Sequence, residues 1–78
     1  MNVASLLGSI RNREIIARGR GFHILAFLVR THGGRNWRKV KGDAYIRDKD
    51  GKEYDAEIHW FEAHGVGKVR VRVKRRLE

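Results

Sequence analysis

Acidic, imidazole and cationic side chains recur at a spacing of two residues near the C-terminal end of the chain. The stretch EIHWFEAHGVGKVRVRVKRR contains Glu57, His59, Arg70, Arg72 and Lys74. RNA cleavage through the 2′-hydroxyl needs a base, an acid for the leaving 5′-oxygen, and cations that stabilise the phosphorane. An imidazole serves as base or acid near neutral pH, and a guanidinium holds phosphate through two hydrogen bonds. We therefore predict a site that binds RNA phosphate and cleaves the adjoining bond.

Each candidate has an assigned role in this prediction. His59 is the base or acid, and Glu57 is a second base or fixes the charge state of His59. His64, in the glycine turn HGVG, is a third catalytic candidate. The predicted phosphate or RNA contacts are Arg70, Arg72, Lys74, Arg18, Arg20 and, as a base-stacking ring, Phe61. This chemistry needs no metal ion and no cofactor.

A structural interpretation of the same residues stands beside the functional one. Glu57 and His59 can form ordinary cross-strand ion pairs, and the C-terminal cations can form a solvated strand edge. The sequence favours core positions for Trp37 and Trp60. It favours a position on a helix face for His23 and at a helix terminus for His32.

The composition limits the class of protein and partner. The 78 residues suit one domain spanning residues 1–78, without cysteine. Lys and Arg number 18 against 9 acidic residues, so the net charge of +9 predicts a polyanionic partner. The longest apolar run, FHILAFLV, is shorter than the roughly 18 residues that a membrane span requires. We expect no membrane association, no signal peptide and a cytoplasmic location.

The N-terminal half predicts two helices. Asn2 can cap a helix from Val3, and Leu6, Leu7 and Ile10 follow at helical spacing. The glycines of ARGRG, residues 17–21, should end this helix. The apolar run FHILAFLVRTHGG predicts a second helix, because it is long for a strand and ends in cations and Gly33-Gly34.

The C-terminal half predicts an antiparallel meander of three strands. Ala44 and Ile46 alternate with polar residues, the turn DKDG follows, and Ile58 and Trp60 continue the pattern. Val69, Val71 and Val73 then alternate with cations. The predicted fold class is α+β, with one or two N-terminal helices packed on a three- to four-stranded antiparallel sheet. His59 should lie opposite Arg70 or Arg72, and Glu57 opposite Arg72 or Lys74.

The order of these features resembles the small C-terminal toxin domains of bacterial polymorphic and contact-dependent inhibition systems. The resemblance rests on a helix ending in Gly-Gly, the stretch NWRKVKGDAYI, and AEIHWFEAHGVG followed by a Lys/Arg-rich strand. It covers roughly residues 20–76 and involves layout rather than a diagnostic motif. Many such domains look like the barnase, EndoU, colicin and RelE group of metal-independent ribonucleases. Because Met1 begins the chain, the sequence looks more like a free-standing intracellular toxin, or an isolated domain, than a secreted effector.

Three functions remain open from the sequence. The preferred prediction is a metal-independent endoribonuclease toxin acting as a monomer or homodimer, which the resemblance pairs with an acidic antitoxin or immunity protein. The alternative is a non-catalytic basic protein that binds RNA or DNA through its charge. The third is a structural or protein-interaction module.

Overall fold

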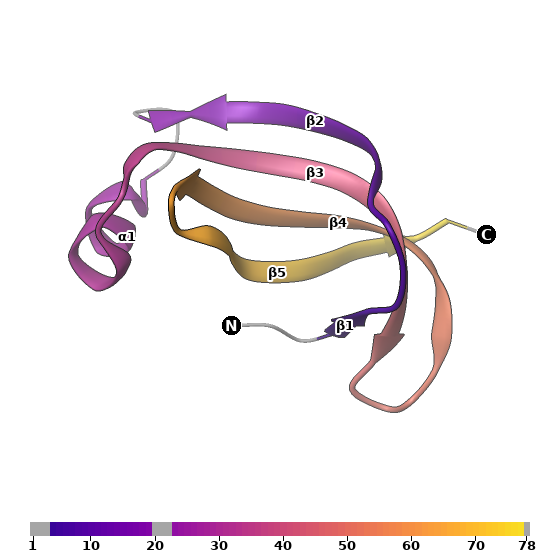
Figure 1. Cartoon of the computed structure of the whole chain (residues 1–78). Coiled ribbons are helices and arrows are strands. Elements are labelled where there is room, and N and C mark those ends of the chain that lie inside the picture. Colours follow the sequence, from indigo (N-terminus) through magenta and orange to yellow (C-terminus); the bar gives the residue numbers. More distant parts are fainter. Residues whose placement is uncertain (1–3, 20–22, 78) are drawn as a thin grey trace.

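The described residues form a small α+β fold in which one short helix lies at the end of an antiparallel sheet (Figure 1). The computed structural model describes residues 4–19 and 23–77. The elements are β1 (Ala4–Leu6), β2 (Arg11–Arg18), α1 (Leu25–His32), β3 (Arg35–Asp48), β4 (Glu53–His64) and β5 (Gly67–Arg76). The predicted α+β class is therefore confirmed.

The five strands form one sheet that curves back on itself. Its order is β1-β3-β4-β5, and β2 pairs with another stretch of the same strand β3. β1 pairs with the end of β3 at 46–48, whereas β2 pairs with residues 38–43. Figure 1 shows β3 and β4 bending so that β1 comes round to the side of β5, which it approaches closely. The curved sheet thus encloses much of its own core.

The main core lies on the inner face of this curve. The alternation of apolar residues predicted for β3 and β4 is confirmed, because Ala44, Ile46, Ile58 and Trp60 are all buried. The cluster also contains Val40, Ala56 and Val71, with Ile10, Ile15, Tyr54 and Val73 packed against it. A core this small leaves a modest stability margin, as is usual for a domain of this length.

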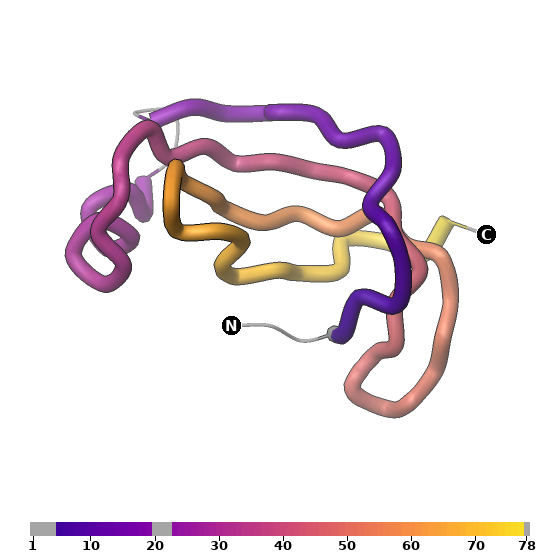
Figure 2. Tube along the Cα trace, viewed as in Figure 1, coloured from indigo at the N-terminus to yellow at the C-terminus, as the bar shows by residue number. Residues whose placement is uncertain are grey.

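A second cluster anchors α1 against the outer face of the sheet. Leu28 of α1 and Trp37 at the start of β3 are buried with Ala63 of β4. Phe61 packs against the same cluster, and it alternates along β4 with the inward-facing Trp60. Figure 2 shows α1 at the end of the sheet where β3 begins and β4 ends. The predicted second helix is confirmed, but it covers only one end of the outer face.

The predicted first helix is wrong within the described residues. Residues 4–6 and 11–18 are strands, and Leu6 and Leu7 are 37% and 39% exposed. Leu6 and Leu7 therefore do not form the buried face of a helix, whereas Ile10 packs against the main core of the sheet. Pairing with the long strand β3 satisfies the backbone of this segment instead and overrides its local helix propensity. The capping residue Asn2 and Val3 lie outside the described residues.

The predicted turn between β3 and β4 is confirmed. Asp48 closes it, because its Oδ1 accepts hydrogen bonds from the backbone N–H of Asp50 at 2.9 Å and of Lys52 at 3.0 Å. Gly51 takes a φ of 87°, a left-handed conformation that glycine adopts without steric cost. This turn fixes the register of the two longest strands.

Two bulges interrupt the regular alternation of β5. Phe61 pairs with Val69 and His59 with Arg72, so Arg70 and Val71 together lie opposite one residue of β4. A second shift follows, because Ile58 pairs with Val73 and Glu57 with Arg75. Each bulge changes the face to which later side chains point. Val71 and Val73 accordingly join the main core while Val69 packs at α1, so the prediction of one shared valine face is wrong.

Gly42 allows the chain before β2 to cross closely over β3. A Cβ at this position would lie 2.5 Å from Ile10 Cγ2 and 3.3 Å from both the Arg11 carbonyl oxygen and Trp60 Cη2. We expect Gly42→Ala to lower the free energy of unfolding by about 1–3 kcal/mol through overpacking, measured by urea denaturation. Gly8→Ala is the control, since nothing lies within 4 Å of a Cβ there. Equal stability of the two variants would contradict this role for Gly42.

The one helix of the described residues is too short to cross a lipid bilayer.

Candidate phosphate-binding pocket

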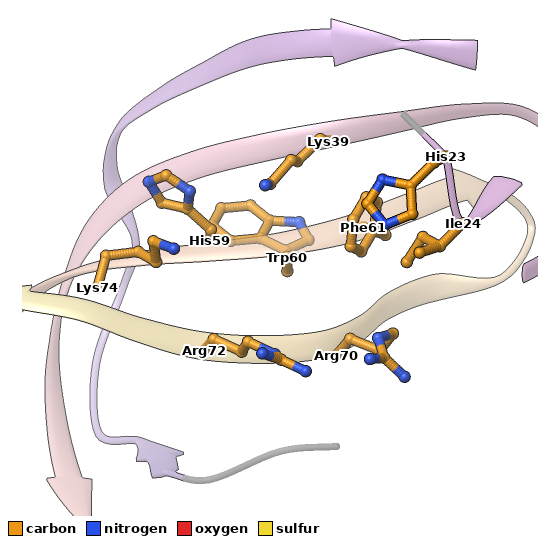
Figure 3. A pocket seen from close by; sticks show the side chains of 9 residues that line it. All are labelled: His23, Ile24, Lys39, His59, Trp60, Phe61, Arg70, Arg72 and Lys74. Carbon is orange, nitrogen blue, oxygen red and sulfur yellow. The ribbon is translucent and has the colours of Figure 1, made fainter. Parts of the chain in front are cut away.

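A pocket of about 230 Å³ opens between the outer face of the sheet and the residues that precede α1. Figure 3 shows its lining side chains on β3, β4 and β5, with His59 and Lys74 at one end and His23 and Ile24 at the other. The lining residues are His23, Ile24, Lys39, His59, Trp60, Phe61, Arg70, Arg72 and Lys74. The pocket therefore combines four cations, two imidazoles and an apolar part, and none of these described residues is acidic.

The strand register and the bulges of β5 position this set. Lys41, His59 and Arg72 form one row across β3, β4 and β5. His59, which was predicted to lie opposite Arg70 or Arg72, therefore pairs with Arg72. Arg70 belongs to the first bulge and has a φ of 57°, a conformation that is unusual for a residue with a side chain. Lys74 is the additional residue of the second bulge. Both irregularities therefore supply cations to the same pocket.

Five acidic residues in the described part of the chain, Glu14, Glu53, Asp55, Glu57 and Glu62, pair with cations outside the pocket. Among the described residues, carboxylates form ion pairs with Arg11, Arg13, Arg38, Lys41, Arg47 and Arg75. In the same part of the chain no carboxylate pairs with any of the four pocket cations, Lys39, Arg70, Arg72 and Lys74. Lys39 lies 5.6 Å from the Phe61 ring centroid, and Arg70 5.7 Å from that of Phe27. Aromatic faces orient these two charges without cancelling them.

A carboxylate holds the imidazole at one end of the pocket. His59 Nε2 lies 2.8 Å from Glu57 Oε2, and Arg75 Nε donates to Glu57 Oε1 at 2.9 Å. Hydrogen bonds from His59 and then from Arg75 keep the pKa of the Glu57 carboxyl below its usual value. An ionised carboxylate only accepts hydrogen bonds, so His59 Nε2 carries the proton in this contact. Glu57 thus fixes the tautomer of a neutral His59, which leaves its lone pair on Nδ1.

The second nitrogen of His59 has a different environment. Nδ1 is buried and has no hydrogen-bond partner among the residues that the structure describes. The whole side chain is 16% exposed, so the ring lies at the pocket wall rather than projecting into solvent. A buried polar atom without a partner is costly and is uncommon in folded proteins. The arrangement suits an atom that acquires its partner when a ligand binds.

The structure brings together only part of the predicted site. Phe61, His59, Arg70, Arg72 and Lys74 line the pocket, and Glu57 contacts it through His59. Glu57 itself pairs with Arg75 and not with Arg72 or Lys74, because of the second bulge. That expected pairing was wrong.

Other predicted residues lie elsewhere. His64 lines a separate hollow with Gly34, Arg35 and Asn36, so it does not share the pocket with His59. Arg18 ends β2, where it pairs with Arg38 and is absent from the pocket lining. The sequence reasoning placed Arg18 beside the start of the second helix, whereas Arg18 is the last residue of β2 and the helix begins at Leu25. Arg20 lies outside the described residues.

Two pocket residues were missed as site residues by the sequence reasoning. His23 was placed on a helix face, whereas it precedes α1 and lines the pocket. Lys39 was not considered as a site residue, although it lies at the same spacing of two residues as Asp43 and Tyr45, which were assigned to the polar face. In the structure it pairs with Phe61 of β4. The expected core positions of Trp37 and Trp60 are confirmed, since they are 2% and 0% exposed. His32 ends α1 as expected.

A buried carboxylate network on the inner face was also missed. Glu62 is 9% exposed and accepts hydrogen bonds from Trp60 Nε1 at 2.7 Å and from Arg38 Nε at 2.9 Å. Arg13 of β2 donates to the same carboxylate. The sequence did contain a signal for this position. Glu62 follows Ile58 and Trp60 at the same spacing of two residues, and this alternation assigns Glu62 to the core face. The network ties β2, β3 and β4 together beneath the pocket floor.

No group of three or more potential ligating side chains that could hold a metal ion is found within residues 4–19 and 23–77. Comparison with protein families, curated proteins and solved structures gives no match to this chain. The pocket is therefore the feature of this chain that bears on its function.

Proposed function

We propose that this chain binds single-stranded RNA and that the pocket holds a phosphate of the RNA backbone. The observation that carries this proposal is the set of four pocket cations without a carboxylate partner among the described residues. Unneutralised cations repel one another, and a phosphate with its two ester linkages removes that repulsion through charge-assisted hydrogen bonds. The net charge of +9 draws the polyanion toward the surface.

The shape of the pocket favours a single strand over a duplex. The recess is lined by the apolar or aromatic residues Ile24, Trp60 and Phe61 as well as by cations. A single strand can turn its phosphate, sugar and base separately into such a recess, whereas a duplex presents a smooth backbone. Single-stranded nucleic acid is commonly bound by such a combination of positive charge and aromatic surface.

The test compares two double variants that each remove two positive charges. Arg72→Ala/Lys74→Ala removes two exposed pocket cations, whereas Lys49→Ala/Lys52→Ala removes two exposed cations near the β3–β4 turn. We expect the pocket variant to bind a labelled RNA 10-mer about tenfold or more weakly, because two charge-assisted contacts are lost. The slope of the logarithm of the binding constant against the logarithm of the salt concentration should become shallower by about 1.4, at roughly 0.7 per lost phosphate contact.

The turn variant should retain nearly the parental affinity, measured by fluorescence anisotropy between 50 and roughly 200 mM salt. Equal losses in the two variants would show that net charge alone drives binding and would overturn the pocket assignment. Absence of binding by the parent at the lowest salt would overturn the proposed function.

The Glu57–His59 contact favours a second candidate function, which is cleavage of the bound RNA. In this reaction His59 Nδ1 accepts the 2′-hydroxyl proton while O2′ forms a bond to phosphorus. The P–O5′ bond breaks, and a protonated pocket side chain, His23 or Lys74, returns a proton to O5′. The products are a 2′,3′-cyclic phosphate and a 5′-hydroxyl. Because Nδ1 is buried, the hydroxyl reaches it only after neighbouring side chains move. Binding is therefore the first proposal and cleavage the second.

A further inference from the structure

A row of side chains leads from the pocket along the exposed face of α1. His23 lines the pocket, and Phe27 follows four residues later, with Arg30 three residues beyond it. Phe27 and Arg30 both lie in α1, where residues three apart are neighbours on the helix surface. His23 stands just before the first helical turn, which the backbone hydrogen bond from Leu28 N–H to Ile24 O at 3.0 Å begins. The row therefore runs from an imidazole at the pocket to an aromatic ring and then to a cation.

Phe27 is exposed although it sits beside a buried face of the same helix. Its exposed fraction is 47%, whereas Leu28 is completely buried in the cluster that anchors α1. The ring does not serve that cluster, which is built from other residues of α1 and the sheet. An exposed aromatic ring next to a cationic pocket is the usual stacking surface for a base of single-stranded nucleic acid.

Arg70 connects this ring to the pocket. Its guanidinium carbon lies 5.7 Å from the Phe27 ring centroid, and the same residue lines the pocket. The bulge and the positive φ of 57° at Arg70 direct its side chain to this place at a conformational cost. One guanidinium can thus contact a phosphate in the pocket and the edge of a base held over the ring.

We propose that Phe27 and Arg70 form a base subsite for the nucleotide adjacent to the phosphate in the pocket. This inference rests on the proposed function, since the phosphate in the pocket determines where the next nucleotide of the RNA lies. The occupant is a base of single-stranded RNA, because the positive charge around the ring complements a polyanion and repels a basic peptide. Stacking accepts any base, so this subsite adds affinity with little sequence preference.

The test uses two RNA probes of equal length and charge, pentauridylate and the same backbone without bases. We expect Phe27→Leu to weaken binding of pentauridylate about tenfold, because the flat ring is lost while apolar bulk is kept. Phe27→Trp should bind at least as well as the parent, since indole stacks strongly. None of these substitutions should change binding of the base-free backbone. Val29→Leu, at another exposed apolar position of α1 that is 45% exposed, is the matched control.

The outcomes separate the subsite from the function on which it depends. Equal binding of pentauridylate by the parent and Phe27→Leu, with the base-free backbone still bound, would overturn the subsite alone. Equal weakening of both probes in Phe27→Leu would also overturn it, because the ring would then support the phosphate pocket. Failure of the parent to bind either probe would overturn the proposed function together with the subsite.

Discussion

Replacement of Glu62 by alanine is expected to lower the free energy of unfolding by about 2–3 kcal/mol. The change leaves the buried Trp60 Nε1–H without its acceptor and removes the partner of Arg38 and Arg13. A fully buried ion pair that loses one member costs about 3–5 kcal/mol. The cost here is smaller, because the side chains of Arg38 and Arg13 are 24% and 46% exposed and regain water. Urea denaturation of parent and variant measures the difference.

Glu53→Ala provides the matched control for this prediction. Glu53 also binds an arginine, Arg47 at 2.8 Å, but the two side chains are 40% and 52% exposed. An exposed pair of this kind contributes under about 1 kcal/mol. Comparable losses in Glu62→Ala and Glu53→Ala would show that the network on the inner face adds no special stability.

The Glu62 carboxylate also gives stability a defined pH dependence. Burial raises its pKa, but hydrogen bonds from Trp60 and Arg38 and the charges of Arg13 and Arg38 together bring it below the ordinary value of 4.5. Its stabilising contribution is present above that value and is lost as pH falls through the lowered pKa of the folded state. Glu62→Gln should reduce the loss of unfolding free energy as the pH falls through the acid range. The remaining loss comes from Glu57 and Asp48, whose pKa values are lowered too. The same pH dependence of the unfolding free energy in Glu62→Gln and the parent would contradict this role of Glu62.

Replacement of His59 by asparagine should separate cleavage from binding, if the second candidate function holds. We expect cleavage of a single-stranded RNA in EDTA to fall about 10²–10⁴-fold, because a positioned general base contributes that factor. Affinity should change little, since the pocket cations remain. The measurement is the rate of product formation under single-turnover conditions, with binding measured on RNA whose 2′-hydroxyls are methylated. The methylated RNA should be bound by the parent and left intact.

His64→Asn is the control for this experiment, because His64 lines a different hollow. It should cleave at the parental rate. Equal rates for the parent and His59→Asn would remove His59 from the mechanism. Tight binding without cleavage by the parent would leave the pocket as a binding surface only.

Much of the sheet could be predicted from local patterns. The alternation around Ile58 and Trp60, the turn at Asp50-Gly51 and the helix before Gly33-Gly34 each carry a signal that near neighbours in sequence determine. The same patterns placed His59 opposite Arg70 or Arg72, and the structure pairs it with Arg72. These features needed no knowledge of distant contacts.

The remaining features depended on contacts between distant segments. Leu6, Leu7 and Ile10 fit a helix equally well, and only the presence of β3 as a pairing partner decides for strands. The bulges of β5 could not be predicted from the sequence, because Val69, Val71 and Val73 alternate with cations without interruption. His23 reached the pocket because α1 docks at the sheet end, which helix periodicity alone does not specify.

The bulges of β5 also bear on how this protein avoids aggregation. β5 ends the strand order, and β1, which approaches it, is only 3 residues long against the 10 of β5. The rest of the outer edge of β5 is where a strand from another molecule would add to the sheet. A straight edge of alternating valine and cation would offer an even row of backbone donors and acceptors to such a strand. The two register shifts break that row twice within ten residues. The irregularities that bring Arg70 and Lys74 to the pocket therefore also make the edge a poor template for fibril growth.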